Sequence, residues 1–281
     1  MKKTLIALAV ILSSIVTQAQ VLAPQPSPKS TINQIVGLTD VEIEYSRPSA
    51  RGRNVFGELV PFGKVWRTGA NSNTTISFSE DIVIDGKTLK KGKYALFTLP
   101  KVESWEIIFY SKTDNWGNPE EWNEGDVALR AIAIPEVLNK NAETFTIDIS
   151  NLDNNFAYLN LSWEKTLVSL KFDVPTQKAA IVSIEKALAG PTAGDYFSAA
   201  QYYFQSNGDI SKASTFVNKA IELNKQNPFW YTKLKSLIQA KLGDKKGAIE
   251  TAKLSLAAAK VAKNDDYVKM NEDNILEWSK K

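Results

Sequence analysis

The spacing of apolar residues changes once along the chain, close to Pro175. Upstream of it, apolar and polar residues alternate, as at residues 41–45 and 144–149, and a period of two is typical of half-buried antiparallel strands. Downstream, apolar residues recur every three or four positions, which is the period of an amphipathic helix. We therefore predict an antiparallel β-sandwich or jelly-roll over residues 31–174, followed by a helical domain over residues 175–281.

The alternating region has room for about nine or ten strands. Residues 156–163 and 166–174 both alternate, and we interpret Glu164 and Lys165 between them as a tight turn. No helical period interrupts this region. Residues 20–30 are predicted to form a short extension before the first strand.

The helical region repeats itself at an offset of 35 residues. The turn at residues 207–209 corresponds to the turn at residues 242–244, and Ala213 corresponds to Ala248. Each unit consists of a helix, a turn containing Gly and Asp, and a second helix, which resembles tetratricopeptide repeats in layout and period. Ser255 departs from that pattern, because alanine is usual at its position. We predict a short tetratricopeptide-like array of helical hairpins, with a plain helical bundle as the alternative.

The first 19 residues have the three parts of a secretory signal peptide. Lys2 and Lys3 are followed by an apolar stretch at residues 5–16, and Ala19 ends a cleavage site of small residues. The apolar stretch is short for a membrane span. We therefore expect cleavage that leaves Gln20 as the first residue, and a protein that is periplasmic or secreted. An uncleaved membrane anchor is the alternative.

The chain contains neither cysteine nor histidine. Disulfides, thiolate or imidazole metal ligands, cysteine nucleophiles and Ser-His-Asp triads are therefore excluded. We expect no metal site and no cofactor. The net charge is +3, and the predicted leader contributes two of the positive charges. A nearly neutral exported protein is a poor candidate for nucleic-acid binding.

One acidic stretch keeps a hydrolase among the alternatives. Its carboxylates are interleaved with two tryptophans, and its members are Asp114, Trp116, Glu120, Glu121, Trp122, Glu124 and Asp126. A glycoside hydrolase uses two carboxylates, one as acid and one as base or nucleophile. A solvated loop between two strands has the same composition, and it is the simpler interpretation.

Four of the five arginines lie within residues 47–67, a segment rich in glycine and proline. A guanidinium group is a rigid fork that binds carboxylate or phosphate, and glycine lets backbone amides approach a ligand. The residues predicted to bind an anionic or sugar-like ligand are Arg47, Arg51, Arg53, Trp66, Arg67 and Asn71. The alternative is that the arginines anchor loops, by bonding carbonyl groups and by pairing with acids such as Glu42, Glu44 and Glu58.

The same part of the chain carries long sequence motifs. Residues 45–53 are Tyr-Ser-Arg-Pro-Ser-Ala-Arg-Gly-Arg, residues 65–71 are Val-Trp-Arg-Thr-Gly-Ala-Asn, and residues 92–96 have the pattern Gly-x-Tyr-x-Leu. With the Pro-Ser-Pro-Lys start at residues 26–29, this region resembles the secreted bacterial family catalogued as domain of unknown function 2911, over roughly residues 22–174. The resemblance implies an exported β-rich domain, often beside helical repeats. It supplies no activity, so no catalytic residue is inferred from it.

These features predict an exported, non-enzymatic binding module. Its β domain would bind the anionic or sugar-like ligand, and its helical region would present a concave surface to a protein partner. Tyr203 and Phe204 are expected to be buried, and the other aromatics of residues 196–204 and 229–231 to be exposed as anchors. The alternatives are a carboxylate-based glycoside hydrolase and a purely structural envelope protein. For the aromatics of the helical region, the alternative is that they pack against the β domain and make this region an internal brace.

Overall fold

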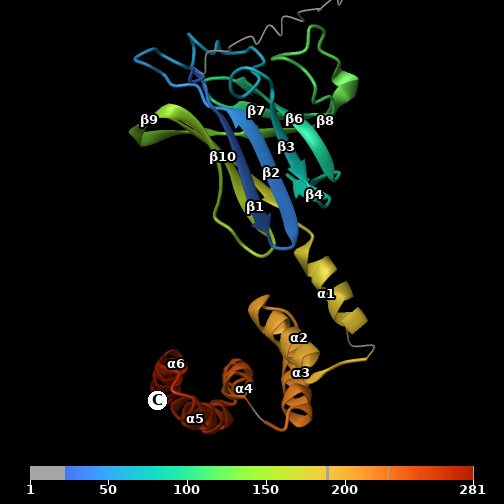
Figure 1. Cartoon of the computed structure of the whole chain (residues 1–281), viewed down its shortest axis with the longest axis vertical. Coiled ribbons are helices and arrows are strands. Elements are labelled where there is room, and N and C mark those ends of the chain that lie inside the picture. Colours follow the sequence, from blue (N-terminus) through green and yellow to red (C-terminus); the bar gives the residue numbers. More distant parts are fainter. Residues whose placement is uncertain (1–22, 188–189, 227, 281) are drawn as a thin grey trace, which may run out of the picture.

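The computed structural model describes residues 23–187, 190–226 and 228–280 (Figure 1). The predicted leader, residues 1–19, lies outside these ranges. Within them the chain forms ten strands and one short 3-10 helix, followed by six α-helices. No helix in the described ranges is long and apolar enough to cross a membrane.

Two antiparallel sheets form the first part of the molecule. The six-stranded sheet contains, in spatial order, β1 (Lys29–Val36), β2 (Thr39–Ser46), β3 (Thr74–Phe78), β6 (Gly92–Pro100), β7 (Trp105–Tyr110) and β8 (Val127–Ala133). The four-stranded sheet contains β5 (Lys87–Leu89), β4 (Ile82–Ile84), β10 (Phe156–Asp173) and β9 (Pro135–Ser150). The 3-10 helix η1 (Glu124–Asp126) precedes β8.

The two sheets share one hydrophobic core. On β2, Val41, Ile43 and Tyr45 are buried while the residues between them are exposed or half-buried, as the period of two predicts. The second sheet contributes side chains such as Leu161 and Phe172 to the same core. The predicted β-sandwich is confirmed.

The interpretation of Glu164 and Lys165 as a tight turn is wrong. Both residues belong to β10, a single strand of 18 residues. Strand β9 pairs with β10 before these residues, at Leu161, and after them, at Val168. Glu164 has a left-handed φ of 50° at a shift in register, which is the geometry of a β-bulge. Its carboxylate accepts a hydrogen bond of 2.8 Å from the backbone N–H of Val55. The strand continues because its partner strand also continues past the bulge.

Six helices follow the sandwich and pack in hairpin pairs (Figure 1). Their bounds are α1 (Thr176–Ala187), α2 (Ala193–Gln205), α3 (Ile210–Leu223), α4 (Phe229–Lys241), α5 (Lys245–Val261) and α6 (Asp265–Trp278). In both predicted Gly-Asp turns, the aspartate caps the N-terminus of the helix that follows. The Asp209 carboxylate accepts hydrogen bonds from the N–H groups of Ser211 and Lys212, and the Asp244 carboxylate accepts one from Gly247. The hairpin array is confirmed, and its assignment as tetratricopeptide repeats stays a prediction.

The aromatic side chains of the helical region build its own core. Tyr203 is buried as expected, whereas Phe204 is only half-buried, with the ammonium group of Lys241 5.3 Å from its ring centroid. Tyr231 is buried, contrary to expectation, because its ring stacks on Phe197 at a centroid distance of 4.4 Å. Each aromatic ring pair found among the described helical residues joins two rings of the helical region itself. These pairs therefore do not support the alternative in which the aromatics pack against the β domain.

The strands and the helices have separate hydrophobic cores. Strand β10 ends at Asp173, and α1 begins three residues later at Thr176. The hydroxyl of Thr176 accepts a hydrogen bond of 3.3 Å from the N–H of Leu38, in the turn between β1 and β2. In the same turn Gly37 has a φ of 58°, and a side chain there would collide with Thr176. The separate cores support a domain boundary at this junction, which stays a prediction.

Ser255, where the repeat pattern favours alanine, links three helices. Its hydroxyl donates a hydrogen bond of 2.7 Å to the carbonyl of Phe229 in α4. It also accepts one of 3.0 Å from the side-chain amide of Asn271 in α6. Ser255 and Asn271 are both fully buried. The serine therefore adds a second acceptor for the Asn271 amide, which also donates to the carbonyl of Tyr267, and a further donor for the carbonyl of Phe229.

The variant Ser255→Ala is expected to lower the free energy of unfolding by about 1–3 kcal/mol, because the buried Asn271 amide loses an acceptor. Urea unfolding followed by circular dichroism measures the change. The matched control is Ser198→Ala, an exposed serine in α2, which should change the stability by less than about 0.5 kcal/mol. Equal effects of the two variants would contradict the role given to Ser255.

Candidate functional site

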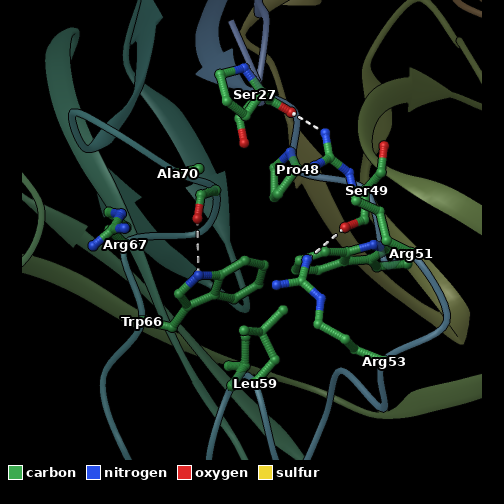
Figure 2. Close-up of a pocket in the computed structure, with 13 residues that line it drawn as sticks. Ser27, Pro48, Ser49, Arg51, Arg53, Leu59, Trp66, Arg67 and Ala70 are labelled. Atoms are coloured by element: carbon green, nitrogen blue, oxygen red, sulfur yellow. Dashed lines mark hydrogen bonds between the residues drawn. The ribbon is translucent and has the colours of Figure 1, made fainter.

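A cavity of 380 Å³ opens among the loops that follow β2 (Figure 2). Strand β2 leads into these loops at its end away from α1 (Figure 1). The connection between β2 and β3, residues 47–73, contributes most of its lining. Arg51, Arg53 and Arg67 line it together with Trp66, and one further tryptophan comes from β10. A long loop held by a rigid sheet is a common setting for a binding site.

Two tryptophans form the inner wall of this cavity. Trp66 bridges to Thr98 of β6, and its ring stacks on Trp163 with centroids 5.8 Å apart. Trp163 is buried and its indole N–H donates to the carbonyl of Glu143. Trp66 is half-buried, and its indole N–H donates to the carbonyl of Gly69 at 3.1 Å (Figure 2). Because both N–H groups are satisfied within the protein, these rings provide apolar surface to a ligand.

Arg51 and Arg53 lie on the same side of the cavity (Figure 2). Arg51 donates a hydrogen bond through Nη2 to the carbonyl of Pro26 at 3.3 Å. Arg53 donates through Nε to the carbonyl of Ala50 and through Nη2 to that of Ser49, both at 2.8 Å. The Nη1 groups of both arginines bond to no described residue. The carbonyls therefore orient each guanidinium group and leave donors for an anion.

Arg67 lies on the opposite side of Trp66 from Arg51 and Arg53 (Figure 2). Its Nη1 packs close to Gly117, where an added Cβ would be 3.2 Å away. Its Nε is buried and has no hydrogen-bond partner among the described residues. Arg67 therefore carries an unsatisfied buried donor at the edge of the cavity, which is unusual in a folded protein.

The cavity lining includes four of the six predicted residues and excludes Arg47 and Asn71. Arg47 donates hydrogen bonds to the carbonyl of Phe145 at 3.2 Å and to the hydroxyl of Thr146 at 2.7 Å, which attaches the loop to β9. The side-chain amide of Asn71 donates to the carbonyl of Ser27 at 3.2 Å. Ser27 itself lines the cavity, so Asn71 contributes to the site by holding Ser27 in position.

Several lining residues were not predicted from the sequence, namely Pro26, Ser27, Pro48, Ser49, Leu59, Val60, Gly69, Ala70 and Trp163. Most of them lie within or beside the motifs that carry the family resemblance, which is the signal that could have found them. Trp163, which also belongs to the pattern of that resemblance, comes from β10 and lies far from the other lining residues in the sequence. The alternating pattern places Trp163 on the inner face of its strand, but no local pattern indicates that it reaches Trp66.

The pairing of these arginines with acids, which is one half of the loop-anchoring alternative, is wrong. Among the described residues, none of the four arginines in residues 47–67 forms an ion pair. Glu44 pairs instead with Lys29 at 2.9 Å and with Lys93 at 3.3 Å, and the hydrogen bond from Lys29 is the main cause of a lowered pKa of Glu44. Glu58 accepts a hydrogen bond from Asn54. The other half of that alternative, bonding to carbonyl groups, is confirmed for Arg47, Arg51 and Arg53.

The acidic stretch forms local ion pairs. Arg130 donates to both carboxylate oxygens of Glu124 and lowers the pKa of Glu124. Lys112 pairs with Asp126 at 2.9 Å and lowers the pKa of Asp126. A glycosidase acid requires a raised pKa, so neither carboxyl group is suited to that role. Within the described ranges, no cluster of three or more acidic groups could hold a metal ion.

Of the two tryptophans in that stretch, Trp116 lies apart from these ion pairs. It is 80% exposed and lines a separate cavity of 310 Å³ with Asp114 and Asn115. This second cavity has both Lys29 and Glu44 in its wall, and these two residues pair with each other. Its charges are therefore matched, in contrast to those of the arginine-lined cavity.

Comparison with known proteins gives one match. The profile of the family described as "Protein of unknown function (DUF2911)" matches residues 27–172, which is more than half of the chain. No curated protein and no solved structure matches the chain. The matched region contains the whole connection that lines the arginine-rich cavity.

Proposed function

Because the chain belongs to the DUF2911 family, whose description names no activity, we propose a function from the site alone. The protein is an exported, non-enzymatic binding module whose arginine-lined cavity takes a small anionic or sugar-like ligand. One observation carries the proposal: three arginines line a single cavity, and none of their guanidinium groups forms an ion pair with an acid among the described residues. Several guanidinium groups that lack acidic partners and line one concave site favour an anionic ligand.

The size and the walls of the cavity restrict the ligand. A volume of 380 Å³ lies near the lower end of the range for small-molecule sites, which is roughly 300–1,000 Å³. The ring of Trp66 supplies an apolar surface that suits the C–H face of a sugar ring. Arg51 and Arg53 supply donors on one side of it. A monosaccharide that carries a carboxylate fits both walls.

We expect the protein to bind glucuronate at least about tenfold more tightly than glucose, because only glucuronate has a carboxylate that forms ion-paired hydrogen bonds with the arginines. Isothermal titration at low ionic strength measures both affinities. Equal affinities, or binding of neither sugar, would contradict the proposal. Screening by added salt should weaken glucuronate binding and leave glucose binding unchanged.

The export part of the proposal rests on the leader in residues 1–19. We expect the exported protein to begin at Gln20 and to be recovered from the periplasm or the medium. Intact-mass spectrometry of the fractionated protein measures this. A retained Met1, or recovery with the cytosol, would show that the leader is not cleaved.

The helical region is proposed to bind a protein partner. Most of its aromatic rings are committed to its own core, but Trp230 at the start of α4 is 41% exposed. Tryptophan is among the residues that contribute most to protein interfaces. Residues 176–281 also contain 16 lysines and 11 acidic residues, so the partner surface is expected to be acidic.

A further inference from the structure

A third cavity lies within the helical region, between α2, α4 and α6, and has a volume of 270 Å³. Its wall is mainly apolar and aromatic, with Phe197 from α2, Trp230 and Leu234 from α4, and Met270 from α6. Lys233 is the one charged residue in its lining. An apolar cavity with a few polar groups and one charged group is the usual composition of a small-ligand site.

Lys233 is buried without a partner. Lys233 as a whole is 8% exposed. Its ammonium group forms no ion pair and no hydrogen bond with any described residue. Desolvation lowers the pKa of Lys233, and no neighbouring charge contributes to the change. The side chain is largely buried, and partial desolvation of an ammonium group that has no partner costs free energy. A counter-charge from outside the chain would remove that cost.

We propose that this cavity binds a small carboxylic acid with an apolar or aromatic body, whose carboxylate pairs with the ammonium group of Lys233. The body of the acid contacts the rings of Phe197 and Trp230, and Gln201 in the wall provides an amide for the second carboxylate oxygen. A phosphate fits this site less well, because apolar walls would leave its further charged oxygens without partners. This site is separate from the arginine-lined cavity and does not depend on the function proposed for it.

The probe for this site is 3-phenylpropanoate, compared with 3-phenylpropanamide, which has the same shape and no charge. Isothermal titration of the full protein should show the acid binding at least about tenfold more tightly than the amide. The variant Lys233→Met should bind both compounds equally. The matched control is Lys235→Met, on the same helix and outside the cavity lining, which should keep the preference for the acid.

Three outcomes overturn this proposal: no binding of the acid, equal binding of acid and amide by the unmodified protein, or a preference that persists in Lys233→Met. Circular dichroism checks that each variant is folded. If Lys233→Met is not folded, Lys233→Gln takes its place, because glutamine removes the charge and keeps a polar end. A preference that Lys233→Gln retains would overturn the proposal equally.

Discussion

The double variant Arg51→Gln, Arg53→Gln is expected to weaken glucuronate binding by about 100-fold or more, because each arginine loses a charge-assisted hydrogen bond to the ligand. At residue 53 the glutamine amide nitrogen takes the place of Nε, which donates to the carbonyl of Ala50, whereas at residue 51 the Nη2 bond to Pro26 is lost. Both arginines are exposed at the cavity rim, so their removal should change the melting temperature by only a few degrees, on the order expected for surface substitutions. Titration and thermal unfolding of the same preparation measure the two effects.

The control for this variant is Lys64→Gln, Lys91→Gln, which removes the same net charge from two exposed lysines outside the cavity lining. Its affinity for glucuronate should change by less than about threefold, because long-range attraction is screened. The ligand proposal would be wrong if both double variants weakened binding equally. It would also be wrong if the arginine variant lost stability and kept its affinity, since the arginines would then serve only to hold the loop.

The variant Lys233→Met is expected to raise the free energy of unfolding by about 1 kcal/mol in the absence of ligand, because it removes a partly desolvated cation that has no partner among the described residues. Methionine has a similar length and suits the apolar wall. Urea unfolding at neutral pH measures the change, with Lys235→Met as the control. A loss of stability in Lys233→Met would show that the ammonium group has a favourable environment, contrary to its burial.

The lowered pKa of Lys233 also predicts how the folding stability depends on pH. The pKa of Lys233 is lowered in the folded protein, so between that value and the ordinary value of 10.5 the unfolded chain binds more protons at this residue. The stability of the unmodified protein should therefore rise with pH across this window, relative to Lys233→Met, and the difference between the two proteins should disappear above it. Tyr267 is the one other titratable residue in the cavity lining, and it is present in both proteins.

Much of the fold follows from residue periodicity. The alternation on β2 predicts both its extended form and its buried face, and the Gly-Asp pairs predict the turns that Asp209 and Asp244 cap. The bulge at Glu164 could not be predicted, because a charged pair between two alternating runs is equally consistent with a turn. The choice depends on whether β9 continues beside it, and this is a long-range property.

The candidate sites could be predicted from the sequence less completely than the fold. The density of arginines in residues 47–67 indicated a site, and the structure shows which of them share a cavity. The arginine density in the sequence could not distinguish Arg53, which lines the cavity, from Arg47, which attaches the loop to β9. Lys233 gave no signal at all, because its cavity is assembled from α2, α4 and α6, which are not contiguous in the sequence.

The most direct measurement of the central claim is a crystal structure of the protein with glucuronate. We predict that the sugar occupies the cavity between the β2–β3 connection and β10. Its carboxylate should lie within about 3 Å of the guanidinium nitrogens of Arg51 or Arg53, with its ring against Trp66. Glucuronate bound instead beside Trp116, or found only at scattered surface lysines, would contradict the assignment of the arginine-lined cavity as the binding site.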